Sequence, residues 1–280
     1  MNIKSASTIL TANIKTLTGV AKASVKTKNG GTLLDADASS FITTAGITDE
    51  SIKTALYTLY GSLKSNSLYS KIYEFLPIVG GTSGSHAVFG KNPARTLVTW
   101  KGSPTHNSSG VTGNGSSQYG RLNWNPVTEG ASLTSFGFGI YKGVTPTVSR
   151  MYTGIRDSSF NMTVLQTDGT SKNAGFIAGY QFSDIVSTGT GTGNFLFIKT
   201  DGSRSARISA DGVYKAAFTQ TLTSFPSLGF YLLAVSNNGS VYQPAATTAK
   251  FWIATQGLSD TQVATLSTII TQFQTDLGRA

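Results

Sequence analysis

Acidic side chains between residues 78 and 257 are the first candidates for chemistry, because glycoside hydrolysis needs two carboxylates roughly 5 to 10 Å apart. Alternate residues of one strand point to the same side, so acids at i and i+2 would bring two carboxylates together. No two acids have that spacing in one predicted strand, and Asp168, Asp201 and Asp211 each precede a glycine, which is typical of turns. The remaining acids are Glu129, Asp157 and Asp184. The sequence therefore gives little support to a polysaccharide depolymerase.

The two histidines, His86 and His106, are the other candidates for chemistry. Neither lies in a GxSxG nucleophile elbow, so a serine-hydrolase triad is not indicated. The small-residue stretch 81–86 does not match GxGxxG, which argues against a phosphate loop. Two histidines without a thiol or a nearby carboxylate are a weak metal-ligand set, and the chain has no cysteine. We expect no catalytic residue, metal or cofactor, and we expect the histidines to make structural hydrogen bonds.

Residues that could hold a sugar gather between Lys101 and Asn125. Aromatic faces pack on sugar rings, and amides hydrogen-bond to sugar hydroxyl groups. The segment is polar, rich in glycine and too long for a simple hairpin, which is typical of a functional loop. Trp100 and Trp252 lie in strand-like runs and are expected in the core. The candidate glycan-binding residues are Trp124, Tyr119, Asn107, Asn114 and Asn123.

The charge of the chain is strongly positive but dispersed. Lys+Arg 22 against Asp+Glu 13 gives a formal net charge of +9 over 280 residues. No basic cluster is interleaved with stacking aromatics, so nucleic-acid binding is not indicated, and a dispersed positive field suits an acidic partner surface or an anionic polysaccharide. No apolar run approaches the roughly 18 residues of a membrane span, and the start lacks a signal-peptide core. We expect a soluble protein made in a cytoplasm, with neither nucleic acid nor membrane as a partner.

Residues 1–45 differ from the rest of the chain in their pattern of lysines and β-branched residues. The segment 14–19 recurs as 25–30, and each copy alternates apolar and polar residues before a glycine. This pattern predicts a short strand followed by a tight turn. One β-hairpin or a flexible leader would explain it, and so would an arm that adds strands to a partner or a sister subunit. The docking residues of such an arm would be Lys15, Lys22, Lys26 and Lys28.

The sequence predicts helices on both sides of a long series of short strands. Thr48 would cap a helix with an apolar stripe, and a second short amphipathic piece covers 68–75. A C-terminal helix begins at Ser259 or Asp260, and Gly278 ends it. Between these helices, Asn-Gly and Asp-Gly turn signals separate runs rich in Val, Ile, Phe, Tyr and Thr. The predicted strands are 96–100, 135–141, 148–154, 161–167, 174–180, 194–200, 205–209, 213–219, 229–236 and 249–255.

These elements predict an all-β fold. The spacing of the strands fits a two-sheet antiparallel jelly-roll sandwich, with a helix before it and the C-terminal helix packed on it. The chain lacks the alternation of strand and helix that a parallel sheet requires. We place an N-terminal docking or leader segment at 1–45, and the jelly-roll domain with its flanking helices at 46–280.

Three stretches carry a resemblance to a known family. They are LPIVGGTSGSHAVFGKNP at 76–93, WKGSPTHNSSGVTGNGSSQYG at 100–120 and GLSDTQVATLSTIITQFQTDLGR at 257–279. They resemble a domain that recurs in tailed-bacteriophage virion proteins, a concanavalin A-like lectin/glucanase jelly roll carried on tail, fibre or head-decoration proteins. The resemblance implies a fold and a virion setting but no activity, because the Glu-x-Asp-x-x-Glu motif of the glucanase branch is missing. It also implies that His86 and His106 fix loop geometry at one end of the sandwich.

Two functions of different classes follow. The first is a non-enzymatic virion structural protein, displayed on the particle surface as a tail, fibre or capsid-decoration component and docked through its N-terminal segment. Its partners would be other virion proteins and further copies of itself, and it would reside in the virion after synthesis in the host bacterial cytoplasm. The alternative is a dedicated receptor-binding lectin or adhesin that binds a host surface polysaccharide. The position in the virion, the stoichiometry, the sugar and the host are left open by the sequence.

Overall fold

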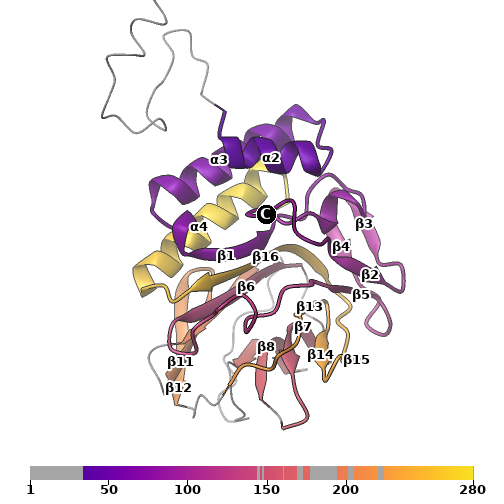
Figure 1. Cartoon of the computed structure of the whole chain (residues 1–280), viewed down its shortest axis with the longest axis vertical. Helices are drawn as coiled ribbons and strands as arrows, with labels where there is room; N and C mark the ends of the chain where they lie inside the picture. Colours follow the sequence, from indigo (N-terminus) through magenta and orange to yellow (C-terminus); the bar gives the residue numbers. More distant parts are fainter. Residues whose placement is uncertain are drawn as a thin grey trace, which may run out of the picture.

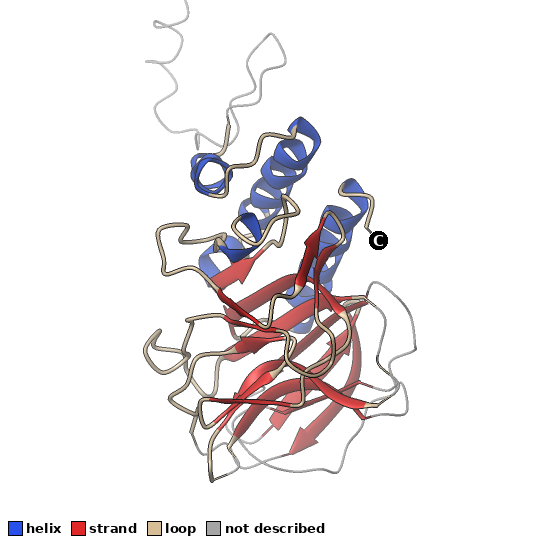
Figure 2. Ribbon diagram, turned by 90° about the vertical axis from the view of Figure 1, so that its right-hand side faces the viewer, coloured by secondary structure: helices blue, strands red, loops and turns tan. Residues whose placement is uncertain are grey.

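Two β-sheets packed face to face, with a layer of helices over one of them, form the body of the protein (Figure 1, Figure 2). The computed structural model describes residues 34–143, 146, 148–159, 161–168, 173–176, 194–200, 205–219 and 224–279. Within these ranges each sheet has 8 strands. The predicted fold class, an all-β two-sheet sandwich with a helix before it and a helix after it, is confirmed.

The first sheet lies between the helices and the core. Its strands run in the order β12-β11-β10-β6-β16-β4-β3, and β1 pairs with β16 beside this path. Every pair in this sheet is antiparallel. The strands are β1 (Ile72–Leu76), β3 (Thr105–Asn107), β4 (Gly110–Thr112), β6 (Phe136–Lys142), β10 (Asn194–Thr200), β11 (Ser205–Ala210), β12 (Val213–Thr219) and β16 (Thr248–Gln256).

The second sheet has the order β15-β14-β7-β13-β5-β2, with β8 paired to β7 and β9 paired to β8. The pair β14 and β7 is parallel and the others are antiparallel, so this sheet is mixed. The strands are β2 (Thr99–Lys101), β5 (Tyr119–Arg121), β7 (Ser149–Arg156), β8 (Met162–Asp168), β9 (Asn173–Phe176), β13 (Tyr231–Leu232), β14 (Val235–Asn237) and β15 (Ser240–Tyr242).

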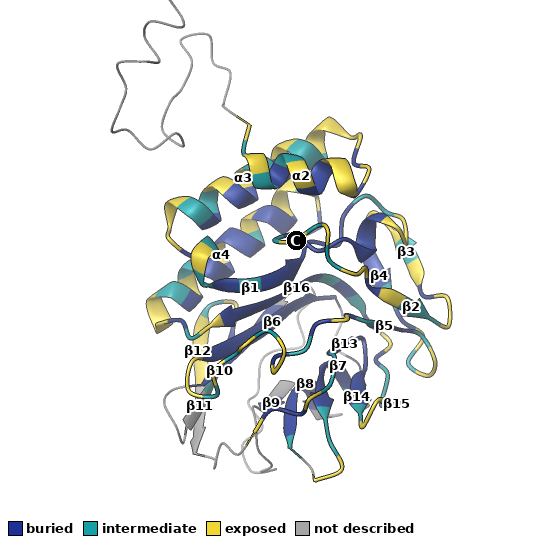
Figure 3. Cartoon of the chain, in the orientation of Figure 1, coloured by how far each residue is buried: buried dark blue, intermediate teal, exposed yellow. Residues whose placement is uncertain are grey.

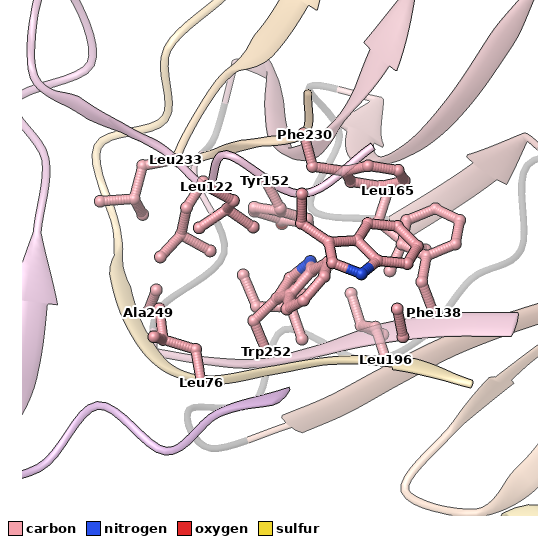
Figure 4. Close-up of a cluster of buried hydrophobic side chains, with 14 of the residues drawn as sticks. Leu76, Leu122, Phe138, Tyr152, Leu165, Leu196, Phe230, Leu233, Ala249 and Trp252 are labelled. Carbon is pink, nitrogen blue, oxygen red and sulfur yellow. The ribbon is translucent and has the colours of Figure 1, made fainter. Parts of the chain in front are cut away.

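The core lies between the two sheets and is rich in aromatic rings (Figure 4). Trp124 and Trp252 are both fully buried, and their rings meet edge to face at a centroid distance of 5.5 Å. Phe230 packs on both tryptophans, and Phe136 stacks on Trp124. Burial of these large apolar surfaces is the main force that holds the sheets together.

Three α-helices cover the outer face of the first sheet: α2 (Ala36–Thr44), α3 (Glu50–Ser65) and α4 (Asp260–Asp276). Figure 3 shows their buried sides turned toward the sheet and their exposed sides turned away. Phe41 of α2 and Phe273 of α4 belong to the same buried cluster as Phe251 of β16. None of the helices in the described ranges is long and apolar enough to cross a membrane.

Two predicted elements differ from the structure. The segment 68–75, predicted as a second amphipathic piece after the first helix, forms a 3-10 turn at Tyr69–Lys71 and then strand β1. It becomes a strand because it pairs with β16, a partner far away in sequence. Helix α2 falls inside the segment 1–45 that the sequence assigned to docking, and its Phe41 is fully buried. The packed body therefore already includes residues before 46. The docking role itself stays a prediction.

The polar segment predicted as one long loop is folded. Between residues 101 and 125 the chain forms β3, β4 and β5 and crosses from one sheet to the other. Short strands of three residues carry too weak an alternation to be recognised from sequence. This difference decides which side chains of the segment are buried and which are exposed.

Candidate functional site

A groove runs along β2, where the chain leaves the second sheet for the first. β2 ends the strand order of the second sheet, and β3 ends that of the first. The groove offers about 790 Å³ of space open to water. Its lining combines one indole, one lysine, apolar side chains and hydroxyl groups, and consists of Ser83, Thr96, Leu97, Val98, Thr99, Trp100, Lys101, Gly102, Ser103, Pro104 and His106. An open hollow of this kind can receive an extended polar ligand.

Trp100 is the aromatic residue of the groove and is half-buried. Its indole N–H donates a hydrogen bond of 2.9 Å to the carbonyl oxygen of Ser83. Its ring meets the ring of His106 edge to face at 4.8 Å between centroids. On the neighbouring strand, a Cβ atom at Gly120 would lie 2.5 Å from the indole, so only glycine lets the ring lie close against β5. These contacts hold the indole in one orientation before any ligand arrives.

His86 and His106 lie side by side and join the 80–86 loop to β3. The two Nδ1 atoms are 3.0 Å apart, and the backbone N–H of Gly81 donates to Nε2 of His86 at 3.2 Å. Because Nε2 of His86 accepts a hydrogen bond, we assign the proton of this ring to Nδ1, which donates to His106. Both rings are then neutral. The pair holds the loop against the strand, although its predicted loop-fixing role stays a prediction until it is tested.

Protonation of either histidine is disfavoured at this place. Burial, followed by the charges of His106 and Arg279, lowers the pKa of His86 to about 3. Burial also lowers the pKa of His106. In the part of the chain that the structure describes, no group of three His, Asp or Glu side chains could hold a metal ion.

The rim of the groove on the side of residues 91–98 is fixed by a buried carboxylate. Glu74 accepts hydrogen bonds from the backbone N–H groups of Phe75, Lys91 and Asn92. Arg95 lies 3.5 Å from its other oxygen and binds Glu129 at 2.6 Å. Burial raises the pKa of Glu74 to about 7, against the effect of these donors. The segment that leads into β2 is thus tied to β1.

Arg279 ties chain segments together near His86. Its guanidinium donates to the carbonyl oxygens of Ile78 at 2.8 Å and Ser108 at 3.4 Å. Lys250 in turn donates to the carbonyl oxygen of Arg279 at 2.5 Å. The three stretches that carry the family resemblance, 76–93, 100–120 and 257–279, therefore meet at one end of the sandwich.

Two predicted sugar-binding aromatics do not face a ligand. Trp124 is 0% exposed in the core, so its assignment to glycan binding is wrong. Tyr119 is 7% exposed and its ring stacks on Tyr231 at 5.1 Å, which covers the face that a sugar would use. Trp100 was predicted in the core, and it packs partly against the same core cluster as Trp124 while it also lines the groove.

The three predicted asparagines are exposed, and their hydrogen bonds serve the fold. Asn107 accepts from the N–H of Ser109, and Asn114 accepts from the N–H groups of residues 116–118, so both shape turns. Asn123 donates to the carbonyl oxygen of Leu97 at 2.6 Å and so supports the groove rim. Their part in glycan binding stays a prediction. The predicted docking residues Lys15, Lys22, Lys26 and Lys28 lie outside the described residues.

Sequence reasoning did not single out Leu97 or Lys101 as site residues. Leu97 is 46% exposed, which is unusual for a large apolar side chain beside a strand, and it borders the groove. Lys101 directly follows Trp100 and also lines the groove. The adjacent Trp-Lys pair before a glycine was the available signal, but the sequence did not show that β2 is an edge strand.

The chain matches no protein-family model and no curated protein. Among solved structures, it is similar to a mutant of Trypanosoma rangeli sialidase displaying trans-sialidase activity, with 12% identity, TM-score 0.51, and coverage of 80% of this chain and 39% of that one. Trypanosoma rangeli sialidase in complex with sialic acid gives 11% identity, TM-score 0.50, and coverage of 76% and 38%. The chain thus spans about two fifths of the length of these sialidases.

A third match covers a smaller share of this chain and nearly all of the matched one. It is the Ruminococcus gnavus IT-sialidase CBM40, with 14% identity, TM-score 0.43, and coverage of 54% of this chain and 92% of that one. At these identities the likeness to the Trypanosoma rangeli structures shows the fold alone. The class defined by the structure is a lectin-like β-sandwich with a helical layer on one sheet.

Proposed function

We propose that this chain is a non-enzymatic carbohydrate-binding β-sandwich that contacts glycans through the groove at Trp100. The observation that carries the proposal is a half-buried indole, held in place by Ser83, His106 and the close approach of Gly120, at the wall of an open groove. An oriented aromatic face binds the apolar side of a sugar ring. The hydroxyl groups of Thr99 and Ser103 in the lining offer hydrogen bonds to sugar hydroxyl groups.

The proposal of binding without catalysis rests on the residues of the groove. Hydrolysis of a glycosidic bond uses a pair of carboxyl groups beside the sugar. Among the described residues, none that lines this groove carries a carboxyl group. Glu74 accepts hydrogen bonds from the backbone of residues 91–92, beside the rim. Its side chain is 1% exposed.

The setting that we propose is the surface of a bacteriophage virion, as a tail, fibre or capsid-decoration component. This part rests on the sequence resemblance, and the sialidase matches neither add to it nor require it. In this setting the segment before α2 docks to other virion proteins, several copies associate, and the groove faces a host surface polysaccharide. The alternative function, a dedicated receptor-binding lectin, uses the same groove and has adhesion to the host as its main role.

Replacement of Trp100 tests the binding proposal. Binding of the protein to a panel of bacterial surface polysaccharides and purified polysaccharides is measured by biolayer interferometry. Trp100→Ala removes the aromatic wall, so we expect affinity for the bound polysaccharide to fall at least roughly tenfold. Leu97→Ala changes an exposed side chain and should weaken binding several-fold without loss of stability.

A matched control uses an exposed apolar residue away from the groove. Val241 is 38% exposed on β15, at the opposite end of the second sheet from β2. Val241→Ala should bind as the unchanged protein does, and thermal unfolding shows whether each variant is folded. Binding that survives in both Trp100→Ala and Leu97→Ala, or a protein that retains no polysaccharide of the panel, would overturn the proposed function.

A further inference from the structure

The charge of the groove is positive and unbalanced. Lys101 lines the groove, and its ammonium group has no carboxylate partner among the described residues. Thr99 pairs with Arg121, and Lys101 pairs with Tyr119, so Lys101 and Arg121 stand on the same face of the β2–β5 ladder. Arg121 does not line the groove, and its guanidinium lies over the ring of Tyr231 at 5.5 Å, so Lys101 is the cation that the groove lining presents.

The acids around the groove do not offset this charge. Arg95 already binds Glu129 at 2.6 Å and lies 3.5 Å from Glu74, so these three groups satisfy one another. Burial lowers the pKa of His106, which also lines the groove and therefore adds no charge to it near neutral pH. Among the described residues that line the groove, Lys101 is thus the cation that a ligand can still meet.

We propose that the groove selects acidic glycans, with the ammonium group of Lys101 bound to a sugar carboxylate or sulfate. This inference rests on the proposed function, because it names the substrate class of the same groove. A charge-assisted hydrogen bond from Lys101 to an anionic group is stronger than a bond between neutral groups. As neighbours in a strand, Trp100 and Lys101 point to opposite faces of β2, yet both line the groove around this edge strand. A glycan that packs one sugar on the indole and follows the groove around the edge can therefore bring an anionic group to the ammonium group of Lys101.

The test compares polysaccharides that differ in charge alone. The probes are polygalacturonate with its carboxyl-reduced product, dextran sulfate with dextran, and any polysaccharide retained in the panel above with its carboxyl-reduced or desulfated form. We expect the acidic member of a retained pair to bind at least tenfold more tightly than the neutral member. The galacturonate and sulfate pairs show which anionic group the groove prefers. The affinity should also fall as salt is raised, because salt screens the charge of Lys101.

Lys101→Gln keeps most of the length of the side chain and removes its charge. It should lower affinity for the acidic probe about tenfold, with little change for the neutral probe. Lys215→Gln is the matched control, because Lys215 is exposed on β12, at the opposite end of the first sheet from β3, and its loss changes the net charge equally. It should leave both affinities unchanged.

The outcomes separate this inference from the proposed function. Suppose that Trp100→Ala and Leu97→Ala abolish binding, while Lys101→Gln changes the affinity for the acidic probe no more than Lys215→Gln does. The groove then binds glycans without selecting for charge, and this inference is wrong. Equal affinity for the acidic and neutral members of a pair would also show that the groove does not select for charge. If neither Trp100→Ala nor Leu97→Ala affects binding, the assignment of the groove as the glycan-binding site is wrong. A protein that retains none of the probes overturns both.

Discussion

His86 illustrates how one side chain can hold two segments without carrying a charge. Its Nδ1–H is assigned as the donor to His106, and its Nε2 accepts the N–H of Gly81. A protonated ring would turn a second N–H toward the N–H of Gly81, so the contact exists for the neutral form alone. Burial disfavours the charged form of Glu74 in the same way and raises the pKa of its carboxyl group to about 7.

We predict that His86→Phe destabilises the protein by about 1 to 3 kcal/mol at pH 7, because it leaves Gly81 N–H and His106 Nδ1 without partners. The pKa of His86 is about 3 in the folded protein and near 6.5 when unfolded. Its contribution is fully present above pH 6.5 and is lost as the pH falls toward 3. The difference in unfolding free energy between the two proteins, measured by urea unfolding, should therefore shrink from pH 7 to pH 4.

Glu74 is present in both proteins, so its own titration cancels in the difference. His106 contacts His86 at 3.0 Å, so the measured difference reports the pair of histidines. Above pH 7 the cost of His86→Phe should be constant. A cost that stays the same or grows on acidification would mean that His86 is not held neutral. A variant as stable as the unchanged protein at pH 7, with glycan binding lost, would contradict the loop-fixing role.

Among the secondary-structure elements, local capping signals located the starts of α3 and α4 to within one residue but missed α2, which Asp35 caps. Ser259 was one of two predicted caps of the C-terminal helix, and it forms a capping box with Gln262 at the start of α4. The first predicted helix is capped by Asp49, one residue after the predicted Thr48. The segment 68–75 became a strand, because pairing with β16 outweighed its local pattern. Capping depends on neighbours in sequence, whereas strand pairing does not.

We predict that Ser259→Ala lowers the unfolding free energy by about 1 kcal/mol, the usual cost of losing an N-cap. The hydroxyl of Ser259 accepts the N–H of Gln262 at 3.2 Å, and the Gln262 side chain accepts the N–H of Ser259 at 3.0 Å. Thr261→Ala is the control, since Thr261 is exposed in the same turn and should change stability by less than about 0.5 kcal/mol. Equal effects of the two changes, measured by chemical denaturation, would refute the capping role.

At the scale of the whole molecule, the helical layer is part of the same folded body as the sandwich. α2, α3 and α4 share one buried cluster with the first sheet, so they belong to the folded body. The groove lies along β2 of the second sheet, whereas α2 belongs to the helical layer on the first sheet. Docking before α2 and glycan binding at β2 would therefore use different parts of the molecule.

We predict that removal of residues 1–45 lowers the unfolding temperature more than removal of residues 1–33 does, because the longer deletion also takes away buried Ala38 and Phe41 of α2. In the proposed virion setting the shorter deletion should also keep the protein from phage particles, which gold-labelled antibodies and electron microscopy would show. Incorporation of the truncated protein would contradict the docking role. Particles that never carry the full chain would contradict the virion setting.

Signals within the sequence were enough to predict the all-β class, the turns at 211–212 and 238–239, the C-terminal helix and the gathering of chemistry-bearing residues between 76 and 125. These features follow from near neighbours along the chain: the period of apolar residues, Asn-Gly and Asp-Gly turns, and capping residues. The three segments with the family resemblance were also visible in the sequence, although not their meeting place.

The packing of the folded chain determines which tryptophan lies in the core and which lines the groove. Trp100 and Trp124 both belong to polar, glycine-rich surroundings, and their exposure depends on β2 being an edge strand and on Phe136 and Trp252 covering Trp124. The contact between His86 and His106 likewise requires two segments 20 residues apart to meet. Such contacts come from packing between distant segments, and a pattern of neighbours along the chain does not encode them.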